Sequence, residues 1–233
     1  PPMRRLVDPA AGTLAVAPSK TRQLTLNDMM GASEMEMVEL LLNNTKMSGK
    51  RADGTVRTDF TAVTVGGMTE YVSELPAEGE TEVWEIVNLT ADAHPIHTHL
   101  TQVQLMNRQK FHRNRYNKAY EGSFPGGASM FGDGPPLTYA PSVASGLKYG
   151  GNPNIQPYLH GPVHPPEVNE AGWKDTVIAY PGQVTRLAVR FAPTDTAVGV
   201  ARSYSFDPDA GAHGFVWHCH ILDHEDNDMM RPI

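Results

Sequence analysis

The segment GFVWHCHILDHEDNDMM, residues 214–230, decides the fold and points to its chemistry. Its first residues are aromatic and β-branched, which favours a strand, and consecutive side chains of a strand point to opposite faces. Cys219, the only cysteine of the chain, then lies on one face, and His218 and His220 lie on the other. One short strand would therefore present two different sets of donor atoms.

A second histidine cluster, HPIHTH at residues 94–99, follows the strongest predicted strand, TEVWEIVNL at residues 81–89. The pattern alternates after His94, so we expect a strand that continues to about Met106. His97 and His99 share one face of that strand. Two such His-x-His pairs on neighbouring strands would bring four imidazoles to one place.

The rest of the chain contains short β-type runs separated by turn residues. These runs are RQLTLN (22–27), MVELLLNN (37–44), DFTAVTV (59–65), WKDTVIAY (173–180) and VTRLAVRFA (184–192). With 21 glycines and 19 prolines in 233 residues, the sequence favours many turns and short strands over long helices. We therefore predict an all-β protein, a Greek-key β-sandwich or barrel.

We predict one domain over residues 22–233, preceded by a Pro/Ala-rich segment at residues 1–21. That segment is expected to be a linker, or an arm that lies on a neighbouring domain. Residues 111–171 are predicted to be an inserted loop, with one short helical piece around Arg115–Tyr120. A loop of this length is typical of a substrate-side lid or a subunit contact, and a purely solvated loop is the alternative.

Composition excludes several classes of protein. The formal net charge is −7 without any block of Lys and Arg, which argues against a nucleic-acid partner. No run approaches the ~20 apolar residues of a membrane-spanning helix. The chain begins PPMRRLVDPAAG, with neither an initiator Met nor a signal-like apolar segment, so we expect a processed or excised piece. Asn43 and Asn88 stand in Asn-x-Thr motifs, which matter only in a eukaryotic secretory route.

The cysteine cluster has the donor set of a blue-copper site. Such a site takes one thiolate, two imidazoles and a weak axial thioether. Cys219 supplies the thiolate, His224 one imidazole and Met229 the thioether, and His94 can supply the second imidazole. Zinc is the main competitor, but a structural zinc site usually takes several thiolates, and this chain has one.

The two His-x-His pairs are not explained by that site. Alternation directs His97, His99, His218 and His220 away from the Cys219 sulfur, toward a second metal site. The two sites would be joined covalently through Cys219 and its neighbouring histidines. This arrangement suits a protein that collects electrons at one copper and delivers them to several others. His112, His160, His164 and His213 show no comparable spacing.

HPIHTHL and WHCHILDHEDNDMMRP resemble the two copper-binding signatures in the last cupredoxin domain of multicopper oxidases. The resemblance is to the laccase-like branch, which includes spore-coat laccases, bilirubin oxidases and phenoxazinone synthases. GWKDTVIAYPGQVTRLAVRF, between the two motifs, is also similar to that branch. The similarity covers most of residues 22–233, apart from the inserted loop, and implies a cupredoxin-like fold.

The resemblance implies a role for each ligand position. It places type 1 copper on His94, Cys219, His224 and axial Met229, and type 2 copper on His97. It places the type 3 pair on the three remaining residues, His99, His218 and His220. The implied reaction couples four one-electron oxidations of a reducing substrate to the reduction of dioxygen to water. Cys219 is the electron path, and Glu225 is a candidate for proton delivery or for a hydrogen bond at the cluster.

The chain departs from the family in one respect. The family's trinuclear cluster takes eight histidines, and four of them come from two His-x-His motifs in the first domain. This chain has only the pairs at residues 97–99 and 218–220, so it carries half a cluster. We therefore expect an obligate complex with a second polypeptide, or with N-terminal cupredoxin domains, that supplies two further His-x-His motifs.

Three other functions compete with the oxidase. A stand-alone type 1 electron carrier needs the four blue-copper ligands and leaves the His-x-His pairs unexplained. A copper-storage subunit is supported only by methionines such as those at positions 29, 30, 35 and 37. A nitrite reductase-like trimer uses type 1 and type 2 copper but needs no His-Cys-His pair for a dinuclear centre. These motifs do not identify the reducing substrate, which could be phenol-like or a metal ion. The resemblance to the family implies export to the periplasm, the cell surface or the medium.

Overall fold

The structure, a computed structural model, describes residues 2–30, 37–45, 47–49, 60–65, 67–122, 152–201, 204–207 and 214–233. Strands predominate in this part of the chain. The elements are β1 (Val7–Asp8), β2 (Thr13–Leu14), β3 (Lys20–Met30), β4 (Met37–Leu42), β5 (Thr61–Val65), β6 (Met68–Val72), β7 (Thr81–Asn88), β8 (His94–Thr98), β9 (Val103–Phe111), α1 (Arg113–Gly122), η2 (Gln156–Tyr158), β10 (Leu159–His164), β11 (Trp173–Lys174), β12 (Thr176–Ala179), β13 (Gln183–Arg190), β14 (Val216–Cys219), α2 (Leu222–Glu225) and β15 (Met230–Pro232).

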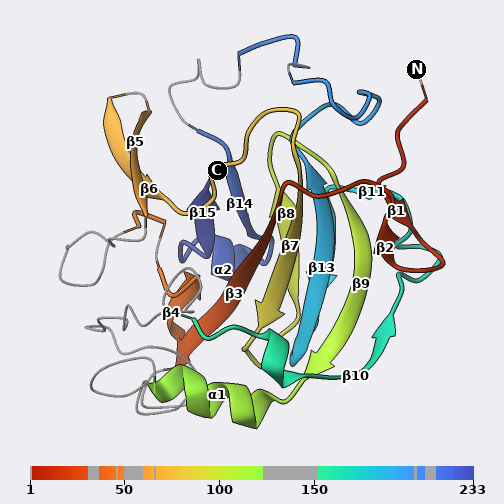
Figure 1. Ribbon diagram of the computed structural model, residues 1–233. Coiled ribbons are helices and arrows are strands. Elements are labelled where there is room, and N and C mark those ends of the chain that lie inside the picture. The colour runs from red at the N-terminus through yellow and green to blue at the C-terminus, as the bar shows by residue number, and fades with distance from the viewer. Residues whose placement is uncertain are drawn as a thin grey trace.

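Two sheets make up the body of the domain (Figure 1). The larger has seven strands in the order β10-β9-β13-β7-β3-β4, with β11 also pairing with β9. The smaller has four strands in the order β12-β8-β14-β15. Strands β3 and β7 are parallel, and β7 and β13 are antiparallel. The prediction of an all-β, cupredoxin-like domain is confirmed.

The central strand β7 explains why TEVWEIVN is the strongest strand signal in the sequence. All of its residues are buried, because both faces of the large sheet are covered at this point. Trp84 and Ile86 belong to the core shared with the small sheet. Val83 packs under the N-terminal arm and Val87 packs near α1. A strand covered on both faces has a nearly continuous apolar sequence.

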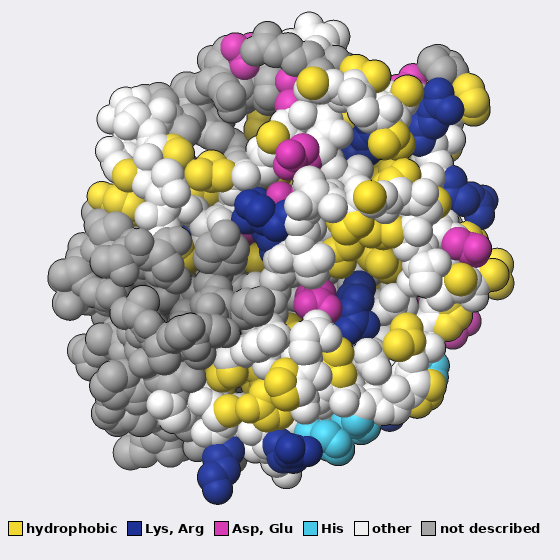
Figure 2. Space-filling model, viewed as in Figure 1, with side chains coloured by type: hydrophobic (Ala, Val, Ile, Leu, Met, Phe, Trp, Pro, Cys, Tyr) yellow, Lys and Arg dark blue, Asp and Glu magenta, His cyan; other side chains and the backbone are white. Residues whose placement is uncertain are grey.

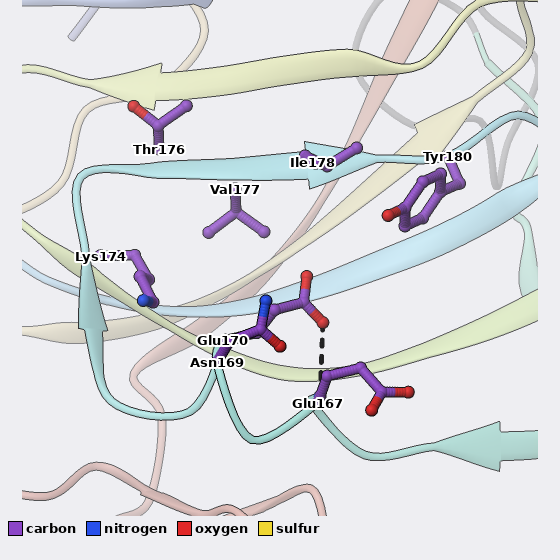
Figure 3. A pocket seen from close by; sticks show the side chains of 8 residues that line it. All are labelled: Glu167, Asn169, Glu170, Lys174, Thr176, Val177, Ile178 and Tyr180. Carbon is purple, nitrogen blue, oxygen red and sulfur yellow. Dashed lines mark hydrogen bonds between the residues drawn. The ribbon is translucent and has the colours of Figure 1, made fainter.

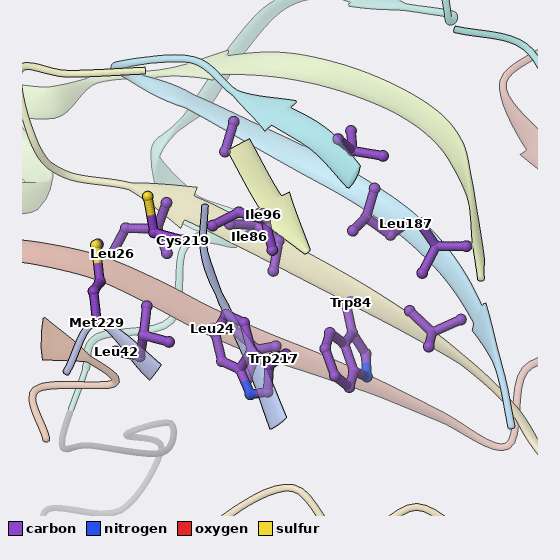
Figure 4. Close-up of a cluster of buried hydrophobic side chains, with 14 of the residues drawn as sticks. Leu24, Leu26, Leu42, Trp84, Ile86, Ile96, Leu187, Trp217, Cys219 and Met229 are labelled. Atoms are coloured by element: carbon purple, nitrogen blue, oxygen red, sulfur yellow. The ribbon is translucent and has the colours of Figure 1, made fainter. Parts of the chain in front are cut away.

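The main core fills the space between the two sheets (Figure 4). Trp84 of the large sheet and Trp217 of the small sheet meet edge to face, with ring centroids 5.5 Å apart. Each indole N–H donates to a buried carboxylate: Trp84 to Glu82 at 2.9 Å, and Trp217 to Glu74 at 3.3 Å. The sulfur-bearing side chains of Cys219 and Met229 belong to the same core. Two of the candidate copper ligands, Cys219 and Met229, therefore belong to the core that packs the two sheets together.

The N-terminal arm lies on the chain's own large sheet. The backbone N–H groups of Leu6 and Val7 both donate to the Gln104 side chain on β9, each at 3.0 Å. Both residues are buried in a cluster with Val83, Met106 and Ala188. Part of the segment predicted to be a linker, or an arm on a neighbouring domain, therefore covers the outer face of its own domain.

The predicted single strand from His94 to Met106 is wrong, because the structure divides it into β8 and β9. Leu100 lies between them in the left-handed region, with φ of 65°, which ends the strand geometry. Strand β8 belongs to the small sheet and β9 to the large one. The break at Leu100 lets the chain cross from one sheet to the other.

The described parts of the predicted loop at residues 111–171 contain more regular structure than expected. Helix α1 corresponds to the predicted helical piece, and its Tyr116 and Tyr120 pack with Phe111 below the large sheet. Strand β10, of sequence LHGPVH, pairs with β9 at the sheet edge. Edge strands tolerate proline, which is why this run does not read as a strand. Residues 123–151, as well as His213 and residues 31–36 of the methionine-rich segment, lie outside the described residues.

The surface carries no dominant charge on the face seen in Figure 2, where acidic and basic side chains are interspersed with apolar ones. This agrees with the absence of Lys/Arg blocks from the sequence. Within the described ranges, no helix has the length and apolar character needed to cross a membrane.

Candidate metal centre

Strands β8 and β14 pair side by side and divide the ligands between two faces. Their antiparallel register sets His218 opposite His97 and Cys219 opposite Ile96. Along β8 the residues alternate between buried and half-buried, with His94 and Ile96 on the buried side and His97 on the other. Alternation therefore directs Cys219 and His94 into the core, and His218 and His97 out of it.

The inner group consists of His94, Cys219 and His224. The Cys219 Sγ lies 3.5 Å from the Nδ1 of each histidine, and the two Nδ1 atoms are 3.2 Å apart. A point equidistant from these three atoms is about 2 Å from each, close to usual metal–nitrogen and metal–sulfur bond lengths. All three residues are buried. The geometry fits a single metal ion held inside the protein core.

A tight turn after β14 brings His224 and Met229 back to Cys219. Helix α2 begins directly after Ile221, and the His224 N–H donates to the Ile221 carbonyl at 2.9 Å. The Met229 N–H donates to the His224 carbonyl, and the Cys219 N–H to the Met229 carbonyl, both at 3.0 Å. Met229 is fully buried in the same core cluster as Cys219, and Figure 4 shows both sulfur atoms. The turn thus places the Met229 thioether in the same core cluster as the Cys219 thiol.

Burial sets the protonation of the inner group. Burial, with a smaller effect of the nearby His224, lowers the pKa of His94 to about 3. Burial also lowers the pKa of His224, although Asp92 and Asp223 act in the opposite direction. Burial raises the pKa of the Cys219 thiol to about 11. At neutral pH both imidazoles are free to bind a metal, while the thiol must lose its proton.

The outer group consists of His97, His99 and His218, whose donor atoms lie within 4.8 Å of one another. The Nε2 atoms of His99 and His218 are 3.2 Å apart. His220 stands at the rim, with its ring centroid 5.5 Å from that of His97 and 5.4 Å from that of His218. Its side chain is 52 % exposed. The structure therefore brings all four histidines together on the side of the two strands turned away from Cys219, with His218 buried and His220 half exposed.

Backbone carbonyls orient two of these histidines. The Nδ1 of His97 lies 2.8 Å from the carbonyl oxygen of Asp175, and the Nδ1 of His218 lies 3.0 Å from that of Cys219. A carbonyl only accepts, so each Nδ1 is protonated and each Nε2 carries the free lone pair. Sequence patterns do not reveal Asp175, because it acts through its backbone. The Thr176 hydroxyl, 3.3 Å from the same His97 nitrogen, was also missed.

Glu225 lies beside the outer group. Its Oε2 atom is 3.6 Å from the Nδ1 of His218 and 3.8 Å from the Nδ1 of His220. This oxygen is buried and has no hydrogen-bond partner among the described residues. A buried carboxylate oxygen without a donor is costly and is typical of a functional group.

Two further residues that the sequence patterns did not identify as part of the site lie at the end of β7 and in its connection to β8. The Thr90 hydroxyl oxygen lies 2.6 Å from the Nε2 of His94, and Asn88 in turn contacts Thr90. Asn88 is fully buried, as is Asn43, and both side-chain amides donate inside the protein. Neither Asn-x-Thr motif therefore presents an asparagine for glycosylation in the folded chain.

A shallow pocket of about 260 Å³ opens on the outer side of β12 (Figure 3). Thr176, Ile178 and Tyr180 line it together with Glu167, Asn169, Glu170, Lys174 and Val177. Only Thr176 connects it to a candidate ligand, through the contact with His97. His112 and His160, which belong to neither group, stack on each other with ring centroids 4.0 Å apart.

Comparison of the sequence with known proteins finds similarity to a laccase and to a multicopper oxidase. The laccase of Bacillus subtilis (strain 168) is 35% identical over 162 residues, which cover 70% of this chain and 21% of that protein. Multicopper oxidase LPR1 of Arabidopsis thaliana is 36% identical over 162 residues, covering 70% of this chain and 23% of that protein. The chain thus spans between a fifth and a quarter of the length of these relatives.

Solved structures and a family profile extend the comparison. The multicopper oxidase from Campylobacter jejuni, described as a metallo-oxidase, has a TM-score of 0.46 and 16% identity, covering 94% of this chain and 30% of that one. The profile of the multicopper oxidase family matches residues 40–233. That match contains both histidine clusters, so the chain belongs to the multicopper oxidase family.

Proposed function

We propose that this chain is the C-terminal cupredoxin part of a laccase-like multicopper oxidase. In this proposal His94, Cys219, His224 and Met229 hold type 1 copper, His97 contributes to type 2 copper, and the remaining His99, His218 and His220 contribute to the type 3 pair. The observation that carries it is the alternation at β14: Cys219 faces the inner group while the adjacent His218 faces the outer one.

The inner group fits copper by its chemistry. A thiolate with two imidazoles and a distant thioether is the donor set of blue-copper sites. The inner donors are buried, and the low pKa of His94 keeps its imidazole neutral at any physiological pH. With a single cysteine in the chain, a multi-thiolate zinc site has no support.

The outer group fits half of a trinuclear cluster. His220 at its rim is half exposed, and the chain spans about a fifth of the length of the laccase relative. The proposal therefore includes a partner surface, in N-terminal cupredoxin domains or a second polypeptide, that brings two further His-x-His motifs. That surface would cover His97, His99, His218 and His220.

Copper bound in the two groups would supply one-electron oxidation of a phenol-like or metal-ion substrate and four-electron reduction of dioxygen to water. The chain's own residues then have three tasks. The Cys219–His218 peptide joins the two groups by covalent bonds. The core packing around Cys219 excludes water from the inner group. The carbonyls of Asp175 and Cys219 fix the rings of His97 and His218.

Glu225 is proposed to hold or deliver a proton at its Oε2 atom, next to His218 and His220. We expect Glu225→Gln to slow oxygen consumption of the assembled oxidase by roughly 10²-fold or more, the usual effect of removing a proton-transfer group. The blue absorption should not change. The exposed neighbour Asp226 gives the matched control, Asp226→Asn, and equal rates for both variants would refute the role of Glu225.

Copper content and oxygen consumption test the whole proposal. The chain is loaded with copper alone, and then together with a polypeptide carrying two His-x-His motifs. The proposal predicts a blue chromophore in the chain alone, and oxygen consumption with a phenolic reductant only in the complex. A single copper with no oxygen consumption in the complex would support a stand-alone electron carrier. A colourless copper-loaded chain would contradict the type 1 assignment itself.

A further inference from the structure

A buried hydrogen-bonded pair lies behind His94, on the side opposite the metal-facing nitrogen. The Thr90 Oγ1 is 2.6 Å from the His94 Nε2, while the His94 Nδ1 faces Cys219 and His224. Asn88, Thr90 and His94 all have no exposed surface. A polar contact this short and this well buried is isolated from water, so its donor and acceptor roles have a direct effect on the ring.

Asn88 bonds to both the backbone N–H and the hydroxyl of Thr90. Its side-chain Nδ2 donates to the carbonyls of Asp92 at 2.7 Å and Ala179 at 2.9 Å. Its Oδ1 accepts the Thr90 backbone N–H at 2.9 Å and the Thr90 hydroxyl at 2.8 Å. Two carbonyls on one side and an N–H on the other fix the orientation of the amide. The Thr90 hydroxyl thus has two oxygen acceptors, Asn88 Oδ1 at 2.8 Å and the Asp92 carbonyl at 3.2 Å, of which Asn88 is the nearer.

A hydroxyl that donates its proton to Asn88 can only accept from His94. The His94 Nε2 must then carry a proton and donate it to Thr90, which leaves the lone pair on Nδ1. Nδ1 is the nitrogen that completes the inner group. The connection between β7 and β8 thus selects the metal-binding form of the ring before any metal arrives.

We propose that Thr90, oriented by Asn88, is a positioning residue that fixes the tautomer of His94 and lowers the reduction potential of the copper bound there. This inference rests on the proposed type 1 site. An imidazole whose N–H donates to a strong acceptor is a better electron donor at its other nitrogen, and a better donor favours Cu(II) over Cu(I). Loss of the Thr90 hydroxyl therefore shifts the copper toward Cu(I).

The effect of Thr90 on the His94 ring can be separated from a purely structural role of Thr90 and Asn88 in the loop. Asn88 ties the loop to β12 through Ala179, which pairs with His94 in the small sheet. The Thr90 hydroxyl also accepts the Asp92 N–H at 3.2 Å, so Thr90→Val removes one bond within the loop together with the acceptor for His94. The Asn88 bonds to Asp92 and Ala179 remain and keep the loop attached. Thr90→Ser restores the acceptor with a smaller side chain. Thr185→Val is a matched control, because Thr185 is equally buried and its hydroxyl has no hydrogen-bond partner among the described residues.

The experiment is a redox titration of the copper-loaded chain, followed through its blue absorption. At a fixed potential we expect Thr90→Val to raise the Cu(I)/Cu(II) ratio about threefold to tenfold, the effect of one hydrogen bond. Tenfold corresponds to about 59 mV for one electron. Thr90→Ser and Thr185→Val should remain within about twofold of the wild type. Nitrogen-15 NMR of the copper-free chain should show protonated Nε2 at His94 in the wild type and in Thr90→Ser, and a mixture in Thr90→Val.

The outcomes separate this inference from the proposed function. A wild-type chain that takes up copper without a blue band overturns the type 1 site, and the inference with it. A blue wild type whose potential equals that of Thr90→Val overturns the inference alone. A Thr90→Val shift matched by Thr185→Val or by Thr90→Ser would reflect general loosening of the core, and it also overturns the inference.

Discussion

The inner group around Cys219 and the outer group around His97 use the same two strands but differ in how much of their surroundings the chain supplies. Every member of the inner group is buried, and its donor atoms already stand 3.2–3.5 Å apart. The outer group is only partly buried: His218 is buried, but His97 is half-buried and His220 at the rim is about half exposed. The inner group is thus preorganised within this chain, whereas the outer group is the one for which we propose a second, completing surface.

The largest effect is expected from removal of the Cys219 thiolate, which should destroy the inner group. Cys219→Ser should abolish the blue absorption and all substrate oxidation, because a hydroxyl cannot replace the thiolate as a copper ligand at this site. Absorption spectra of the copper-loaded variant provide the measurement. Far-ultraviolet circular dichroism should show a folded chain. A variant that stays blue would show that Cys219 is not a ligand.

Removal of a histidine from the outer group should affect only that group. We expect His97→Ala to keep the blue absorption and to stop oxygen consumption of the assembled oxidase, since His97 faces away from Cys219. Spectra and oxygen-electrode traces on the same sample separate the two effects. His164→Ala, in the exposed edge strand β10, is the matched control. Full oxygen turnover in His97→Ala would contradict the division into two groups.

The buried thiol predicts how copper uptake depends on pH. The pKa of Cys219 is raised to about 11 and that of His94 is lowered to about 3, so near neutral pH only the thiol has a proton to lose. Copper binding should release one proton, and the apparent affinity should rise about tenfold per unit between about pH 7 and 9. Competition with a chelator across this range measures the slope. Cys219→Ser should have no such slope, and an equal slope in that variant would rule out the thiol as the source.

The axial sulfur should give the smallest effect. Met229→Leu removes a weak donor that favours Cu(II), so the potential of the copper should rise, with the Cu(I)/Cu(II) ratio shifted by roughly tenfold. Redox titration provides the measurement. Met230→Leu is the control, because Met230 pairs with His218 and lies on the next position of the chain. A fall in potential for Met229→Leu would contradict the axial assignment.

Much of the site could be predicted because strand alternation is a local property. The opposite directions of Cys219 and His218 follow from the period of a strand, and the spacing from Cys219 to His224 suits one tight turn. The contacts of Thr90 and Asp175 could not be predicted in this way. Thr90 acts from a loop whose conformation depends on Asn88, and Asp175 acts through a backbone atom that carries no sequence signal.

In the fold as well, elements set by local sequence could be predicted, whereas those that depend on tertiary packing could not. The buried strand β7 was predictable because its run of apolar residues is long and both of its faces are covered. The break at Leu100 was not, because a left-handed leucine has no characteristic neighbour and the crossing between sheets depends on tertiary packing. Strand β10 was missed because its glycine and proline are tolerated only at a sheet edge.

The register between β8 and β14 has a consequence for how this protein can change. Insertion or deletion of one residue before His218 would turn Cys219 toward solvent and its neighbouring histidines into the core. A single such event would therefore destroy both ligand groups together. Point substitutions can remove either group alone, as His97→Ala and Cys219→Ser illustrate, but length changes in β14 cannot. Descendants of this chain that keep one group and lose the other must therefore have kept the strand length unchanged.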